Sequence, residues 1–459
     1  MYFNLLFLLS VLCSFVILDC LLPVQALRTY IPLVPAPKLT FESIASPAQG
    51  PKSRTRHVPS PVEGPEPTVS PVEGPEPYTS PEPSTSPILA PEPSTWHVPT
   101  PESNASPVRT PAQAPSPVAP NGCKTYLTGN PIDDCWRQHG QEWAKNRQDL
   151  ANCGVGFGKN AIGGQQGEIY VVTNPKDDPN NPKEGTLRYG VLQDKPLWIV
   201  FANDTLIKLK QPLHIKSFKT IDGRGVEVVI TSSEGTCLGI SNVTNVIVHG
   251  IRIHDCKEDA MTITNSRHIW VDHCSLSRCG DGLIDVVHGS TYVTISSNYF
   301  TYHRKVMLLG NSDKDVEDKD MRITVAYNHF GEGVVQRLPR CRFGYFHVVN
   351  NHYTHWVTYA IGGSANPTIY SQGNRFLVTD TQSSKTVTKH MDATKKEWET
   401  WNWRSEGDMF LNGTDFEQSG SKSLTAYEKA ASLRALPSSL VPLLTRDAGV
   451  LLCEVGKCC

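Results

Sequence analysis

The stretch Phe346–Tyr353, FHVVNNHY, decides the fold, because its pattern returns along the second half of the chain. A short run of strand-forming residues ends in Asn, any residue and an aromatic. Related runs are VTISSNYF at 293–300, ITVAYNHF at 323–330 and PTIYSQGNRF at 367–376. The asparagines are spaced by 30, 23 and 23 residues, in the order Asn298, Asn328, Asn351 and Asn374. Cys274, in IWVDHCSL, holds the same place 24 residues before the first of them.

A repeat of this length with several short strands indicates a solenoid, in which each coil stacks on its neighbour. Connections between parallel strands are right-handed, so we expect an all-β, right-handed parallel β-helix. The asparagines should bond to one another along the stack, and the aromatics should stack inside. A β-sandwich is the alternative, but it would need hairpin signals such as Asn-Gly, and few are present.

The first 120 residues have a different character. The apolar run Leu5–Leu18 is too short to span a bilayer and is followed by small residues at Val24–Ala26, which predicts a signal peptide over residues 1–26. A membrane anchor is the alternative. Residues 27–120 repeat SPVEGPEP and related Ser-Pro and Glu-Pro pairs, which predicts a disordered extension that serves as a wall-associating stalk or a plain spacer. The β-helix domain, with a C-terminal extension packed on it, is expected over residues 121–459.

Charge and cysteine content narrow the function. Lys and Arg total 43 against 45 Asp and Glu, so a broad basic field for nucleic acid or a membrane surface is excluded, and an anionic partner needs a local cluster. Of 13 cysteines, Cys13 and Cys20 would leave with the signal peptide. The remaining odd number lacks zinc-type spacing, which favours disulfides plus at least one free thiol. Sequons at Asn104, Asn203, Asn242 and Asn412 are compatible with a secreted glycoprotein.

The repeat also predicts where the charged residues lie relative to one another. Counted back from the ladder positions, Asp259, Asp285 and Arg337 fall at nearly the same place in their coils, and Lys305 begins the first strand of the coil between the last two. We therefore expect a stripe of carboxylates and cations on one face, with coils about 4.8 Å apart. Asp281 lies beside Asp285 across a glycine turn. Clustered oxygen ligands without thiolates suit Ca²⁺ better than zinc.

Arginines are concentrated next to these carboxylates, at Arg337, Arg340 and Arg342. A lone arginine is usually a solvated charge, but three within six positions indicate an anion-binding site. A calcium ion beside guanidinium groups on an elongated face suits a linear polyanion whose carboxylates bridge to the metal. Polygalacturonate is the extracellular candidate.

At these residues the chain resembles the plant pectate lyase family, which includes pollen allergens. The resemblance runs from about Asn130 to the C-terminus. Its motifs include NPIDDCWR, GFGKNAIGG, KTIDGRGVEV, HIWVDHCSLSRCGDGLIDVVHGST, HRKVMLLGNSD, QRLPRCRFGYFHVVNNHYTHW, YAIGGSANPTIYSQGNRF and EWETWNWRSEGDMFLNG.

The resemblance implies β-elimination, in which calcium bridges enzyme acids and the substrate carboxylate while an arginine removes the C5 proton. It makes Arg337 the base, Lys305 and Arg342 the groups that grip the substrate, and Asp281 and Asp285 the metal ligands, with Asp259 nearby. It also implies the disulfides Cys135–Cys153 and Cys237–Cys256. We expect a secreted, monomeric enzyme of the plant cell wall that contacts neither nucleic acid nor, once mature, a membrane.

Two departures from the family pattern concern the calcium site. IHDC at 253–256 runs directly into KEDA, without the usual cleft loop, and Lys257 stands where the family has an acidic ligand. A like-charge contact at 4 Å costs about 4 kcal/mol at an effective dielectric near 20. The alternative function is therefore a weak or inactive pectin-binding wall protein. A pectin hydrolase is disfavoured, because hydrolysis needs two carboxylates set apart around the bond and here the acids form one compact cluster. Lyase action on fully methylated pectin is disfavoured too, since it offers no carboxylate to the metal.

Overall fold

The computed structural model describes Cys123, residues 128–378 and residues 384–459 of the 459-residue chain. The predicted signal peptide over 1–26 and the predicted proline-rich extension over 27–120 lie outside these residues. Within the described ranges, no helix is long and apolar enough to cross a membrane.

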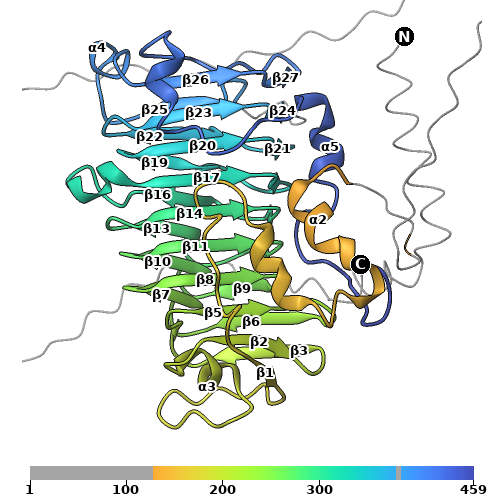
Figure 1. The fold of residues 1–459 in the computed structure, drawn as a ribbon. Coiled ribbons are helices and arrows are strands. Elements are labelled where there is room, and N and C mark those ends of the chain that lie inside the picture. Colours follow the sequence, from red (N-terminus) through yellow and green to blue (C-terminus); the bar gives the residue numbers. More distant parts are fainter. Residues whose placement is uncertain (1–122, 124–127, 379–383) are drawn as a thin grey trace, which may run out of the picture. The chain divides into compact units, whose positions relative to one another are not determined.

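Three parallel sheets form the body of the domain (Figure 1). The ten-stranded sheet has the order β1 (Glu168–Val172), β2 (Leu197–Phe201), β5 (Lys219–Asp222), β8 (Thr244–His249), β11 (Arg267–Asp272), β14 (Thr291–Ser296), β17 (Arg322–Ala326), β20 (Tyr345–Val349), β23 (Thr368–Gln372) and β26 (Trp403–Glu406). The eight-stranded sheet has the order β25 (Thr388–His390), β22 (Ile361–Ser364), β19 (Arg340–Arg342), β16 (Lys305–Leu309), β13 (Gly282–Val287), β10 (Met261–Thr264), β7 (Leu238–Ser241) and β4 (Leu213–His214). The nine-stranded sheet has the order β27 (Met409–Leu411), β24 (Arg375–Leu377), β21 (His352–Tyr353), β18 (His329–Phe330), β15 (Tyr299–Thr301), β12 (Ser275–Ser277), β9 (Arg252–Cys256), β6 (Val228–Ser232) and β3 (Thr205–Leu209).

Successive strands along the chain enter the three sheets in turn, so β10, β11 and β12 make one coil and β13, β14 and β15 the next. Neighbouring coils pair strand by strand in parallel register. The predicted parallel β-helix is confirmed. Helical segments are short: α2 (Pro131–Trp136), η1 (Arg137–Glu142), η2 (Arg147–Cys153), α3 (Leu187–Leu192), η3 (Val316–Asp320), α4 (Lys395–Trp398), η4 (Leu424–Tyr427), η5 (Ser438–Leu440) and α5 (Val441–Leu444).

The predicted asparagine ladder is confirmed. The Nδ2 of Asn328 donates to the Oδ1 of Asn351 over 2.9 Å, and the Nδ2 of Asn298 donates to the Oδ1 of Asn328 over 3.0 Å. The ladder continues to Asn374, and all four side chains are fully buried. At its other end, the Cys274 amide donates to Asn298, so the cysteine holds the ladder place that the sequence predicts for it.

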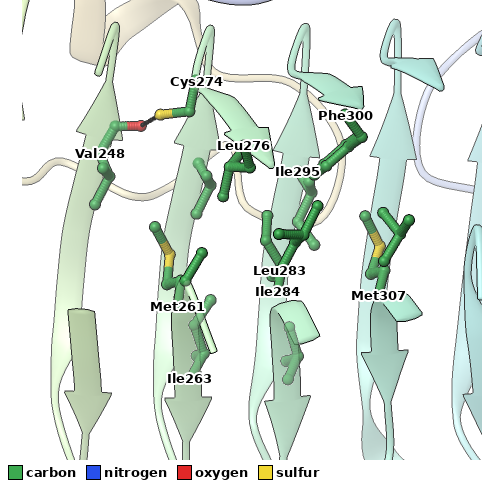
Figure 2. Close-up of a cluster of buried hydrophobic side chains, with 14 of the residues drawn as sticks. Val248, Met261, Ile263, Cys274, Leu276, Leu283, Ile284, Ile295, Phe300 and Met307 are labelled. Atoms are coloured by element: carbon green, nitrogen blue, oxygen red, sulfur yellow. Dashed lines mark hydrogen bonds between the residues drawn. The ribbon is translucent and has the colours of Figure 1, made fainter. Parts of the chain in front are cut away.

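Aromatic rings two residues after each asparagine form a second stack inside the solenoid, also as predicted. Phe300, Phe330, Tyr353 and Phe376 follow one another with ring centroids 5.1, 4.6 and 4.5 Å apart. Figure 2 shows how apolar side chains of adjacent coils stack in the same way, with Met261, Ile284 and Met307 at one register position of the eight-stranded sheet. Equivalent positions of adjacent coils therefore hold apolar side chains that stack on one another, and the core runs the length of the coils.

Segments that precede and follow the β-helix in the sequence cover the outer face of the ten-stranded sheet. Trp136 and Trp143 from the N-terminal helices pack in one buried cluster with Trp198 and Trp270 of the sheet and with Leu444 of α5. The predicted disulfides Cys135–Cys153 and Cys237–Cys256 are present. Two further disulfides, Cys123–Cys458 and Cys453–Cys459, fasten the C-terminal end. Among the described residues Cys274, Cys279 and Cys341 are free thiols.

Replacing Asn328 with aspartate should destabilise the domain, because a carboxylate cannot donate to Asn351 or to the carbonyl of Ile295, both buried partners. Loss of two buried hydrogen bonds should lower the free energy of unfolding by at least about 2 kcal/mol in urea titrations. Asn265→Asp is the matched control, since Asn265 makes the same kind of contact to Asn242 at the surface. Its effect should stay within about 0.5 kcal/mol. Equal losses in both variants would show that the buried ladder has no special weight.

Candidate functional site

The eight-stranded sheet gathers the predicted site residues, but in two rows. Strand pairing places Asp259 level with Gly282, three residues before Asp285. The register continues from Gly282 to Lys305 and from Lys305 to Gln336, so Arg337 lies within one residue of the row of Asp259, whereas Asp285 is level with Leu308 and lies three residues away. The counts back from the ladder already differ by two residues between Asp259 and Asp285, and the turn between β13 and β14, one residue longer than the turn between β10 and β11, adds the third. The prediction that Asp259, Asp285 and Arg337 lie at nearly the same place in their coils is therefore wrong for Asp285.

Gly282 is the point where two of the carboxylates meet. Its N–H donates to the Oδ1 of Asp259 over 2.7 Å, and the hydroxyl of Thr262 donates to Oδ2 over 2.9 Å, so Asp259 is fixed at both oxygens. A Cβ at position 282 would lie 2.7 Å from the Oδ1 of Asp285 and 3.0 Å from the Oδ1 of Asp259. The carboxylates thus occupy the space that a side chain at Gly282 would need.

The surroundings of Asp285 disfavour the ionised form of its carboxyl group. Burial is the main cause that raises its pKa to about 8, and Asp259 adds to the effect, while the guanidinium of Arg337 opposes it. Two carboxylates that lean over one glycine repel each other when both are ionised. A cation bound between them would favour ionisation of Asp285.

Asp281 lies at the exposed edge of the cluster and pairs with Lys305. The Nζ of Lys305 lies 2.5 Å from the Oδ1 of Asp281, whose side chain is 58% exposed. The hydrogen bond from Lys305 outweighs partial burial and holds the pKa of Asp281 below its ordinary value. The Nε2 of His303 donates to the Asp281 carbonyl over 2.8 Å, which fixes this turn. Lys305, predicted to grip a substrate carboxylate, thus already holds a protein carboxylate.

Arg337 lies beside these acids with its guanidinium uncommitted. The residue adopts a left-handed backbone conformation, with φ of 63°, three positions before β19 begins. Its carbonyl accepts from the N–H of Met307 over 2.8 Å, which ties it to β16. Its side chain is partly exposed and makes no hydrogen bond or salt bridge with any residue of the described ranges. Its charge nonetheless lowers the pKa of both Asp281 and Asp285, so it lies close to the cluster.

The other two arginines of this turn are engaged by carboxylates. The Nη2 of Arg340 donates to Asp392 over 2.9 Å. The Nε of Arg342 donates to the Oδ1 of Asp313 over 2.6 Å, and its Nη1 donates to the Gly310 carbonyl over 2.9 Å. Side chains at 340 and 342 leave the outer face of β19, whereas Cys341 between them enters the core.

The acidic cluster has the donor chemistry of a calcium site. Asp259, Asp281 and Asp285 offer oxygen ligands only, and burial together with the neighbouring Asp259 carboxylate raises the pKa of Asp285, so a bound cation would favour its ionised form. Within the described residues, the one group whose ligand atoms lie within 4.8 Å of one another is instead His288, Asp315 and Glu317. A metal held by all three aspartates therefore requires the Asp281 carboxylate to turn away from Lys305.

Lys257, the departure noted in the sequence, lies at the edge of this cluster. It is exposed, it is two residues before Asp259, and its N–H donates to the Ser232 carbonyl over 2.8 Å. Its ammonium forms no salt bridge within the described part of the chain. The shortened connection packs tightly, since a Cβ at Gly280 would lie 1.9 Å from the Lys257 carbonyl oxygen. That its charge weakens metal binding stays a prediction.

Several residues that shape the site escaped the sequence analysis. Asp313 and Ser364 hold Arg342 through a chain of hydrogen bonds, and Gly310 makes room for it, because a Cβ there would lie 2.7 Å from the Cβ of Arg342. The sequence signal was available in LLGNSD, where a glycine and an aspartate follow the strand that begins at Lys305.

Comparison with known proteins identifies the family of the chain. The family model described as pectate lyase matches residues 201–396. Probable pectate lyase 22 of Arabidopsis thaliana is 58% identical over 356 residues, which cover 72% of this chain and 82% of that protein. A pectate lyase of Zinnia elegans is 57% identical over 354 residues, 72% of this chain and 88% of that protein. The crystal structure of Jun a 1, the major allergen from cedar pollen, superposes with a TM-score of 0.67 and 44% identity, covering 70% of this chain and 99% of that one. With this identity and coverage, the chain belongs to the pectate lyase family.

Proposed function

We propose that this protein is a secreted pectate lyase that cleaves de-esterified homogalacturonan by calcium-assisted β-elimination, with Arg337 as the base. One observation carries the proposal: the guanidinium of Arg337, which makes no hydrogen bond or salt bridge to any described residue, lies beside a cluster of three carboxylates. A guanidinium alone would bind anions, and carboxylates alone would bind cations. Together they suit a substrate that brings a carboxylate and an acidic C–H to the same place.

When bound, calcium would neutralise the substrate uronate carboxylate and so make the neighbouring C5 proton more acidic. Arg337, in its neutral form, takes that proton. The electron pair of the C5–H bond then forms the C4=C5 double bond, and the C4–O bond breaks with its electrons leaving on oxygen. Arginine is ordinarily protonated, so the site must disfavour its charged form in the reacting complex. The approach of other cations would have this effect.

Lys305 and Arg342 then act as substrate-binding groups. Lys305 is placed to exchange its Asp281 partner for a substrate carboxylate, which at the same time frees Asp281 for the metal. The net charge around Lys305 changes little in this exchange, because one carboxylate replaces another. The three aspartates supply the metal ligands, with Asp259 already oriented by Gly282 and Thr262.

The second candidate is a pectin-binding wall protein without useful activity. The observation that favours it is Lys257, an exposed cation two residues from Asp259 on the shortened connection. One assay distinguishes the two candidates: purified protein is mixed with polygalacturonate in the presence of calcium or of a chelator. Calcium-dependent ultraviolet absorbance of the unsaturated product supports the lyase. Polymer that is retained without product supports the binding protein.

Arg337→Ala should abolish most of the elimination while leaving the polymer bound. Removal of a general base costs a factor of at least about 100 in kcat. Arg322→Ala serves as the control, because Arg322 lies on the ten-stranded sheet rather than in the cluster. Product formation that survives in Arg337→Ala at more than a tenth of the wild-type rate would rule out this residue as the base.

Asp285→Asn should remove the response to calcium. We expect the wild-type protein to melt at a higher temperature in calcium than in chelator, and the variant to melt at the same temperature in both. Without calcium the variant should be at least as stable as the wild type, since it lacks a repelled carboxylate. Asp315→Asn, which alters the separate group around His288, should keep the calcium response. If Asp315→Asn loses the response and Asp285→Asn keeps it, the metal lies elsewhere.

The same proposal includes secretion through residues 1–26, the extension over residues 27–120 and a cell-wall location.

The sequons of the described ranges differ in how well they suit N-glycosylation. Asn203 and Asn242 are exposed, and no hydrogen bond within the described residues uses either Nδ2. Asn412 already donates its Nδ2 to the Val378 carbonyl over 2.8 Å, and the hydroxyl of its partner Thr414 is buried.

Protein isolated from a plant secretory host should therefore carry glycans at Asn203 and Asn242 but not at Asn412. Glycopeptide mass spectrometry before and after enzymatic deglycosylation measures each site separately. Asn203→Gln and Asn242→Gln should each reduce the apparent mass, whereas Asn412→Gln should not. A protein without any glycan at Asn203 and Asn242 would count against the secretory route.

A further inference from the structure

We propose that Asp313 is a positioning residue of the substrate site: it orients Arg342 so that the guanidinium keeps one amino group for a uronate carboxylate. The proposal rests on the proposed function, since it deepens the role given to Arg342. Asp313 belongs to the loop between β16 and β17, outside the residues that the sequence assigned to the site.

Two hydrogen bonds and burial fix the guanidinium of Arg342. Its Nε donates to the Oδ1 of Asp313 over 2.6 Å and its Nη1 donates to the Gly310 carbonyl over 2.9 Å. The side chain is only 11% exposed. Its Nη2 makes no hydrogen bond to any described residue. A planar guanidinium with two edges occupied can turn only one amino group toward a ligand.

Asp313 is itself held for this task. The hydroxyl of Ser364, on β22, donates to the same Oδ1 over 2.7 Å. Burial disfavours ionisation of Asp313, but the hydrogen bonds from Ser364 and Arg342 outweigh it and hold the pKa of Asp313 below its ordinary value. Ser364 is level with Arg342 in the sheet, so β19, β22 and the loop meet at one carboxylate oxygen.

The loop that carries Asp313 is anchored to the previous coil. The Oδ1 of Asp318 accepts the Gly289 N–H over 2.7 Å, and the Nδ1 of His288 lies 3.6 Å from Asp315 and 3.5 Å from Glu317. His288 and Gly289 form the turn that follows β13, the strand of Asp285. The loop of Asp313 is therefore attached both to the coil that carries Asp285 and to the coil that carries Arg342.

A comparison within the same turn argues for a specific role. Arg340 also pairs with an aspartate, Asp392, over 2.9 Å, but within the described residues the Asp392 carboxylate accepts no second hydrogen bond, and it is 60% exposed. The two pairs share chemistry, and both arginines lie on β19. They differ in that Asp313 is bound by Ser364 and fixes a guanidinium that retains a free amino group.

Asp313→Asn tests the proposal, with Asp392→Asn as the matched control. Arg342 should bind substrate and transition state alike, so Asp313→Asn should raise KM about tenfold and change kcat less than about twofold. Asp392→Asn should change neither. Trigalacturonate affinity, measured by calorimetry in an Arg337→Ala background so that the ligand is not consumed, should fall by the same factor for Asp313→Asn.

The calorimetric arm separates this proposal from the proposed lyase activity. If the wild-type protein forms no product but the affinity falls with Asp313→Asn alone, the positioning role stands and the lyase assignment fails. Ser364→Ala, which removes one hydrogen bond to Asp313, should shift the affinity in the same direction by a smaller factor and decides the matter if Asp313→Asn folds poorly. Unchanged affinity in folded variants, or an equal loss in Asp392→Asn, overturns the proposal.

Discussion

Buried asparagine amides join the coils of this protein one to the next, each donating to the oxygen of its neighbour. An unpaired amide in that position would cost about 1–3 kcal/mol, so the coils cannot slip against one another without breaking every rung. The strands of all three sheets pair in parallel, with local shifts of register between β6 and β9 and between β16 and β19. This pairing sets the spacing of neighbouring coils at about 4.8 Å, the ordinary distance between paired strands.

Charges on the outer face of the eight-stranded sheet are arranged so that most are already compensated. Lys305 is paired with Asp281, Arg340 with Asp392 and Arg342 with Asp313. The carboxylates of Asp281 and Asp392 are 58% and 60% exposed, so these two pairs contribute little to stability. A carboxylate of a polyanionic ligand could replace such an exposed partner, whereas Asp313 is held by Ser364 and keeps Arg342 in place. Asp285 and Arg337 are the exceptions: Asp285 lies next to the Asp259 carboxylate, and Arg337 makes no hydrogen bond or salt bridge within the described residues.

The sequence was sufficient for the fold because the repeat depends on local chemistry. A polar asparagine that recurs inside apolar runs, with an aromatic two residues on, has few explanations other than a buried ladder, and Asn298 to Asn374 occupy those places. Counting along the chain failed for Asp285, because the counts back from the ladder already differed by two residues and one extra residue in the turn after β13 brings its displacement from the row of Asp259 to three. Asp313 could not be found by counting at all. Its position depends on how a loop folds back onto Arg342, and loop paths are not periodic.

The shortened connection at Lys257 bears on which of these arrangements is functional. Its carbonyl packs so closely on Gly280 that a larger residue at 280 would displace the backbone, and Gly280 immediately precedes Asp281. This direct contact helps to fix the turn that carries Asp281, one of the predicted ligands. The positive charge of Lys257 and a fixed backbone at Asp281 would act in opposite directions on a metal ion: the charge would oppose binding, and the fixed backbone would reduce the conformational freedom that binding must remove. A rigid site of three carboxylates, one of them released from Lys305 only when a uronate arrives, would couple metal binding to substrate binding.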